Sequence, residues 1–104
     1  MAKPEKPEKR NHKVTIAQAR ALMSKKHAAL PTHGGHFPRE AIESILEQPG
    51  CEGIRFYYGS NPDGSPAIVL VGIDAELTDM TDDGEIIDNH FPCPPFCGDE
   101  SALR

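Results

Sequence analysis

The sequence predicts an α+β domain in which two N-terminal helices pack on a small antiparallel sheet with a central β-hairpin, followed by an extended Pro/Cys-rich C-terminal segment. Two observations support this prediction. Helical apolar spacing occurs twice before residue 48, and two strand-like runs joined by a turn follow it. A chain of 104 residues has room for one domain, which we place at residues 14–104. Residues 1–13 are rich in Lys, Pro and Glu and nearly devoid of apolar side chains, so we expect a disordered charged tail there.

The first predicted helix covers residues 15–29. Apolar residues at helical spacing run from Ile16 onward, and Thr15 is a suitable N-cap. Gln18 completes only part of a capping box with it. Pro31 ends this helix because proline cannot continue the hydrogen-bonded backbone.

The second predicted helix covers residues 38–48 and follows a loop at residues 32–36. Pro38 suits the first helical position, where its missing N–H leaves no hydrogen bond unmade. Ala41, Ile42, Ile45 and Leu46 supply the apolar stripe of this helix, and the pair Pro49-Gly50 ends it.

A hairpin is the strongest structural signal. Residues 53–58 alternate and place Ile54, Phe56 and Tyr58 on one face, and residues 67–73 form a continuous apolar strand after a turn at residues 60–66. Because the second strand is apolar on both faces, we expect both faces to be covered, one of them by the C-terminal segment or by a partner. Residues 85–87 are predicted to add a short third strand.

Charge and hydropathy exclude several function classes. The net charge is −5, and the basic residues of the tail alternate with glutamates, which disfavours nucleic-acid binding. We find no signal-peptide pattern and no apolar run long enough to cross a bilayer, so we expect a cytoplasmic protein that does not bind membranes. With no Trp and 38% hydrophobic residues the core is modest, and a protein partner or a homo-oligomer would add to its stability.

The C-terminal cysteines are the main candidates for chemistry. Cys93 and Cys97 are separated by three residues, His90 lies three residues before them, and Cys51 occupies a helix-to-strand turn. These four residues supply the ligand types of a Cys3His zinc site, so they are our candidate metal ligands, and zinc is the candidate cofactor. Both a shared zinc and a disulfide require the chain to turn at Pro94-Pro95, because a polyproline II path would separate the two cysteine Cα atoms by roughly 12 Å.

Two alternatives to the zinc site remain open. In the first, the C-terminal segment is a structural strap, with Phe91 and Phe96 packed on the sheet and the cysteines acting as small apolar groups. In the second, Cys93 and Cys97 form a disulfide or take part in thiol redox chemistry, although their spacing is not the Cys-x-x-Cys of thioredoxins.

Other polar clusters give weaker signals. His33 and His36 could offer two imidazoles to a metal, but a polar loop that contains histidines by chance explains them better. The acidic run at residues 74–88 lacks the spacing of a calcium loop, so we expect a solvated loop. No nucleophile has an assigned base, which favours a non-enzymatic protein.

From Gln48 onward the chain resembles a group of small, uncharacterised bacterial proteins. The resemblance rests on a Gln-Pro-Gly-Cys turn, a Gly-Ile-Arg-x-Tyr strand, a Val-Leu-Val-Gly-x-Asp strand and a terminal Pro-Cys-Pro-Pro-x-Cys motif. It implies that the hairpin and the cysteine segment recur together, but it implies no activity and no catalytic residue. The expected function is therefore that of a small soluble accessory or interaction protein, with zinc binding and thiol redox chemistry as alternatives.

Overall fold

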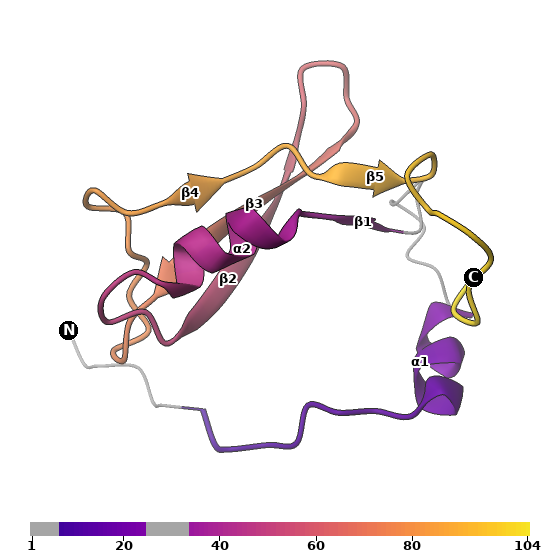
Figure 1. The fold of residues 1–104 in the computed structure, drawn as a ribbon, viewed down its shortest axis with the longest axis horizontal. Helices are drawn as coiled ribbons and strands as arrows, with labels where there is room; N and C mark the ends of the chain where they lie inside the picture. The colour runs from indigo at the N-terminus through magenta and orange to yellow at the C-terminus, as the bar shows by residue number, and fades with distance from the viewer. Residues whose placement is uncertain (1–6, 25–33) are drawn as a thin grey trace. The chain divides into compact units, whose positions relative to one another are not determined.

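The computed structural model describes residues 7–24 and 34–104 of the chain (Figure 1). The described residues group into two compact units. Residues 37–90, together with residue 7, form one that we call the hairpin unit. We call the other the cysteine unit; it contains residues 8–24, 34–36 and 91–104.

The hairpin unit contains the predicted antiparallel hairpin. Strands β2 (Gly53–Ser60) and β3 (Pro66–Ile73) pair along their whole length. The turn between them closes through a 2.8 Å hydrogen bond from the Asn61 N–H to the Ser65 carbonyl. Gly64 has a φ of 88° in this turn, a conformation that glycine adopts at no steric cost. The predicted third strand is present as β4 (Ile86–Ile87), which gives the strand order β2-β3-β4.

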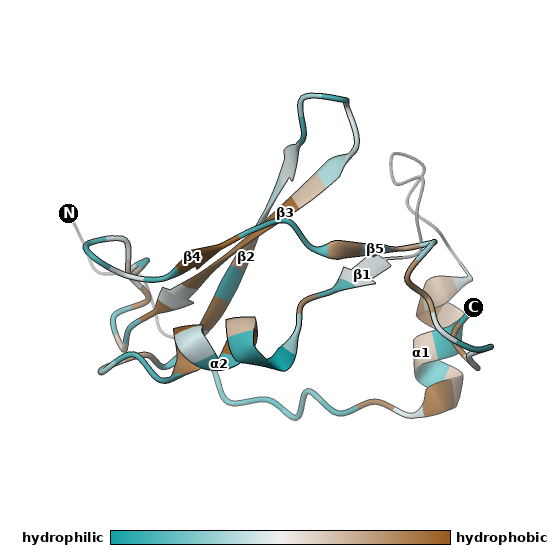
Figure 2. Ribbon diagram, turned by 45° about the horizontal axis from the view of Figure 1, so that its top comes forward, coloured by the Kyte–Doolittle hydropathy of each residue, from teal (hydrophilic) through white to brown (hydrophobic). Residues whose placement is uncertain are grey.

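Helix α2 (Arg39–Leu46) covers one face of this hairpin. It begins one residue later than predicted, because Pro38 has an extended ψ of 157° and is the N-cap rather than the first helical residue. Ile45 is completely buried, and its Cγ2 lies 3.3 Å from the place that a Cβ at Gly72 would occupy. The glycine in β3 thus lets the helix approach the sheet closely. Figure 2 shows that β3 is largely hydrophobic along its length.

The loop after β3 folds back on the other face of the hairpin. Arg55 and Val71 lie opposite each other on that face, and Val71 is only 2% exposed. The Arg55 guanidinium donates to the Leu77 carbonyl at 3.0 Å, so its side chain extends toward this loop. Helix α2 thus covers one face of β3, and on the other face the Arg55 side chain connects β2 to the loop after β3.

The cysteine unit contains helix α1 and a sheet of its own. Helix α1 (Ile16–Met23) is shorter than predicted, and residues 25–33, on which the predicted end of the helix falls, lie outside the described residues. Its capping box is complete: the Thr15 N–H donates to Gln18 at 2.8 Å, and the Gln18 N–H donates to the Thr15 hydroxyl at 3.1 Å. The amide oxygen of Gln18 accepts as a glutamate would, which corrects the expectation of a partial box.

Strands β1 (Gly34–His36) and β5 (Phe91–Cys93) form a two-stranded antiparallel sheet. Residues 34–36 were predicted as a loop, and the strand forms there because a distant segment supplies its partner. Such a non-local pairing leaves no periodic signal in three residues.

The predicted fold of two helices on one sheet with an extended C-terminal segment is wrong. The described part of the chain has two sheets, of two and three strands, and each of its helices is only eight residues long. Helix α2 packs on β2 and β3, whereas α1 belongs to the other unit and has no buried residue. The C-terminal segment is not extended throughout: residues 91–93 form strand β5, and the chain then turns within residues 93–97. The expected division of the chain into a disordered tail at residues 1–13 and one domain at residues 14–104 stays a prediction. No helix in the described parts of the chain has the length and apolarity needed to cross a membrane.

Candidate functional site

The segment after β5 is a tight turn closed by a disulfide. Cys93 and Cys97 are bonded to each other, with their Cα atoms 4.7 Å apart. The peptide bonds Cys93-Pro94 and Pro94-Pro95 are both cis, and the Phe96 N–H donates to the Pro92 carbonyl at 2.9 Å. The prediction that the two sulfurs can meet only if the chain turns at the prolines is confirmed. Of the alternatives that the sequence left open, the structure has the disulfide.

The aromatic rings of this segment pack on each other rather than on a covering sheet. Phe91 and Phe96 contact edge to face with their ring centres 5.3 Å apart, and the His36 ring lies 5.2 Å from Phe91. Phe91 is 42% exposed and Phe96 is 54% exposed. This arrangement differs from the predicted strap, in which both rings were to be buried against the sheet.

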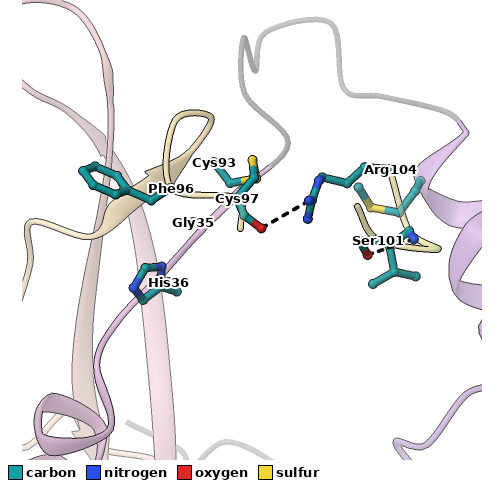
Figure 3. Close-up of a pocket in the computed structure, with 10 residues that line it drawn as sticks. Gly35, His36, Cys93, Phe96, Cys97, Ser101 and Arg104 are labelled. Carbon is teal, nitrogen blue, oxygen red and sulfur yellow. Dashed lines mark hydrogen bonds between the residues drawn. A yellow bond between two sulfur atoms is a disulfide. The ribbon is translucent and has the colours of Figure 1, made fainter. Parts of the chain in front are cut away.

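A hollow of about 440 Å³ lies beside the disulfide within the cysteine unit (Figure 3). Both cysteines line it, together with His36 and Phe96. Arg104 also lines it, and its guanidinium donates to the Cys97 carbonyl at 3.2 Å and to the Asp99 carbonyl at 2.7 Å. These two bonds fix the position of the segment that follows the disulfide.

The four predicted zinc ligands belong to different units. Cys51 and His90 lie in the hairpin unit, and Cys93 and Cys97 lie in the cysteine unit. The Cys51 thiol donates to the Gly53 carbonyl at 3.2 Å, which is within the range for sulfur donors. Among the described residues no three His, Cys, Asp or Glu side chains gather in a way that could hold a metal ion. Zinc binding requires thiolates, so a site made of all four residues stays a prediction for the chain with its disulfide reduced.

The other polar candidates have local structural roles. His36 lies in β1, and His33 is outside the described residues. In the acidic run, the Asp74 carboxylate accepts from the N–H groups of Glu76 and Thr78, at 2.9 and 3.0 Å, and so closes the turn that follows β3. This is the use of aspartate as a turn former.

A polar network that the sequence did not reveal lies on the hairpin face opposite α2. Arg55 donates to Asp79 at 2.6 Å, and the Tyr57 hydroxyl donates to the other oxygen of the same carboxylate. The hydrogen bond from Tyr57, and then Arg55, lower the pKa of Asp79. The same carboxylate raises the pKa of Tyr57 and of Arg55. These contacts hold the loop after β3 against β2.

The half of the hairpin nearer to its turn exposes aromatic side chains on both faces. The exposed fractions are 56% for Phe56, 47% for Tyr57 and 73% for Tyr58. Phe56 and Tyr58 also contact each other edge to face, with ring centres 5.6 Å apart. The run of three aromatics was visible in the sequence, but its exposure was not, because alternation separates the two faces of a strand and does not show which part of a face is covered.

The outer edge of β2 carries backbone groups that β3 does not use. Along an antiparallel pair, every second residue directs its N–H and C=O toward the neighbouring strand, and the residues between direct theirs away. The Asn61 N–H donates to the Ser65 carbonyl, so the odd-numbered residues of β2 face β3. Ile54, Phe56 and Tyr58 therefore direct their backbone groups outward.

The same alternation holds on β3 itself. Gly72 lies opposite Ile54, and its carbonyl accepts from the Met80 N–H at 2.8 Å on the side away from β2. In the sheet order β2 is an edge strand, and no strand among the described residues pairs with its outer side. An eight-residue edge with free donors and acceptors is a template for another strand.

Comparison with known proteins adds no relative to these observations. No protein-family model, no curated protein and no solved structure matches this chain.

Proposed function

We propose that this chain is a non-enzymatic interaction protein that binds its partner by taking up a β-strand on the outer edge of β2. The observation that carries the proposal is the row of outward N–H and C=O groups at Ile54, Phe56 and Tyr58 on an edge strand. Strand addition uses such main-chain groups for affinity and alternate side chains for specificity.

The side chains beside this edge suit a protein partner. Phe56 and Tyr58 stand on one face and are more than half exposed. Aromatic side chains are enriched in the cores of protein interfaces because they bury a large area with few rotatable bonds. A strand added at this edge would cover both rings while satisfying the outward backbone groups.

Site-specific photo-cross-linking tests the proposal. A photoreactive phenylalanine analogue replaces Tyr58, and in a matched variant it replaces Leu22, which is equally exposed, at 71% against 73%. We expect protein cross-links from position 58 and few from position 22. Substitution of Phe56 by proline should abolish them, because it removes an outward N–H without removing a bond to β3. Equal cross-linking at positions 58 and 22, or none at 58, contradicts the proposal.

The disulfide favours a second candidate function, which is thiol–disulfide exchange. In this reaction a thiolate of a small-molecule or protein thiol attacks one sulfur of the Cys93–Cys97 bond and the S–S bond breaks. A mixed disulfide forms, and the released cysteine leaves as a thiolate that takes up a proton. A second thiol then attacks the mixed disulfide, so that the chain gains two hydrogens and the two thiols become one disulfide.

Equilibration with reduced and oxidised glutathione tests this candidate. A couple that exchanges in cells should be partly reduced within the potential range of the glutathione pool, whereas a structural disulfide stays oxidised there. Intact mass under native conditions measures the fraction reduced. Addition of zinc to the reduced chain in the same experiment tests the Cys51, His90, Cys93 and Cys97 site by the mass of a metal adduct.

A further inference from the structure

We propose that the strand taken up by β2 is β2 of a second copy of this chain, paired antiparallel about a two-fold axis at Phe56. The inference rests on the proposed function, since it names the partner for the same edge. It follows from the hydrogen-bond alternation and from the order of side chains along β2.

The outward backbone groups restrict the register. An antiparallel pair exchanges hydrogen bonds only between residues that both direct their groups outward, and in β2 these are even-numbered. With the axis at Phe56, Phe56 faces Phe56 of the second copy and Ile54 faces Tyr58 of the second copy. Ile54, Phe56 and Tyr58 of each copy then all find a partner, and the fourth outward residue, Ser60, lies at the end of the strand and is left unpaired. If the axis moves to Tyr57, Ile54 faces Ser60, and an apolar pair is lost.

The side chains are self-complementary in this register. Ile54, Phe56 and Tyr58 of both copies gather on one face into a continuous apolar strip, and cross-strand aromatic pairs of this kind stabilise sheets. On the other face, Arg55 lies opposite Tyr57 of the second copy, a cation beside an aromatic ring. Arg55 is the one charged residue of β2, and in this register the Arg55 residues of the two copies do not face each other.

Helix α2, the helix of the hairpin unit, does not obstruct the pairing. Helix α2 packs at the end of β2 that holds Ile54, as its contact with Gly72 shows, and leaves Tyr58 exposed at the other end. In the two-fold pair the two β2 strands run in opposite directions. The end of β2 that α2 covers in one copy therefore lies beside the exposed end of β2 in the other copy. The strand also contains neither lysine nor proline, two residues that proteins place on edge strands against such pairing.

A charge-reversal experiment on the full chain tests the inference. Sedimentation equilibrium measures association from about 1 µM to about 1 mM, the range expected for a small interface. Phe56→Lys places two ammonium groups opposite each other on the axis and should weaken association by more than about tenfold. Phe56→Glu should do the same, and an equimolar mixture of the two variants should associate again. Leu22→Lys, an equally charged change at an exposed site, should have no effect.

Amide hydrogen exchange supplies a measurement that needs no substitution. On concentration of the unmodified chain, the amides of Ile54, Phe56 and Tyr58 should become protected, while those of Arg55 and Tyr57 are protected at every concentration. A chain that is monomeric throughout, or a lysine variant that associates like the unmodified chain, overturns the inference. If position 58 nevertheless cross-links to a different protein, strand uptake stands and only self-pairing fails.

Discussion

Removal of part of the Ile45 side chain is expected to destabilise the hairpin unit severely. Ile45 is completely buried, and among the described residues only Leu70 and Val71 join it as buried hydrophobic side chains. A folded unit the size of residues 37–90 has a free energy of unfolding of roughly 3–8 kcal/mol. Ile45→Ala should cost about 2–5 kcal/mol, through lost transfer free energy and the cavity left above Gly72. Such a loss approaches the whole stability of the unit.

Urea unfolding followed by far-ultraviolet circular dichroism measures this cost. Ile45→Val removes one methylene and should cost only about 0.5–1.5 kcal/mol, which leaves a measurable transition. Leu46→Ala is the matched control, because Leu46 is the next residue on the same helix and is 49% exposed. Its cost should stay within about 0.5 kcal/mol. Equal costs for Ile45→Ala and Leu46→Ala would refute the packing of α2 on β3 through Ile45.

Three further predictions concern other parts of the chain. Gly84→Ala should lower the free energy of unfolding by about 1–3 kcal/mol, because a Cβ there would lie far inside contact distance of a backbone carbonyl. Gly34→Ala is the control: open space surrounds Gly34, so the same urea assay should show almost no change. The pKa of Asp79 is lower in the folded chain, so its stabilisation is present above the usual aspartate pKa and is lost as pH falls through the lowered value. The melting temperature of Asp79→Asn should therefore show a weaker dependence on acidic pH than that of the unmodified chain. Reduction of the Cys93–Cys97 bond should add two hydrogens to the intact mass and cost the cysteine unit about 2 kcal/mol, as expected for a five-residue loop; an unchanged melting profile contradicts this.

Local signals in the sequence predicted the hairpin unit well. The alternation of residues 53–58, the apolar run at residues 67–73 and the turn at residues 60–66 each specify structure within a few residues, and these segments form the hairpin. The predicted α2 starts one residue too early, because Pro38 is compatible with both the N-cap and the first helical position, and it ends two residues too late, since the helix ends at Leu46 with Glu47 as its C-cap.

The cysteine unit was predicted poorly because long-range pairing determines it. Residues 34–36 form a strand only because residues 91–93 pair with them, and a Gly-Gly-His sequence has no strand signal of its own. The disulfide could be stated only as one of several outcomes. Whether the two sulfurs meet depends on whether the chain turns between them, and residues 94–96 give no signal that decides this.

The edge of β2 escaped prediction for a related reason. Alternation identifies a strand and its two faces, but the position of that strand in the sheet depends on where the third strand pairs. Once β4 joins β3, no strand within residues 7–24 and 34–104 pairs with the outer side of β2. Exposed aromatic side chains beside a free edge were therefore invisible until the topology was known.

The attachment of the loop after β3 has both an acid limit and an alkaline limit. Protonation of Asp79 removes the charge that binds Arg55, and ionisation of Tyr57 removes the proton that it donates to the same carboxylate. Because the pKa of Asp79 is lowered and that of Tyr57 is raised, each shift extends the pH interval in which the loop stays attached. One carboxylate between two unlike donors thus protects this face of the hairpin against a change of pH in either direction.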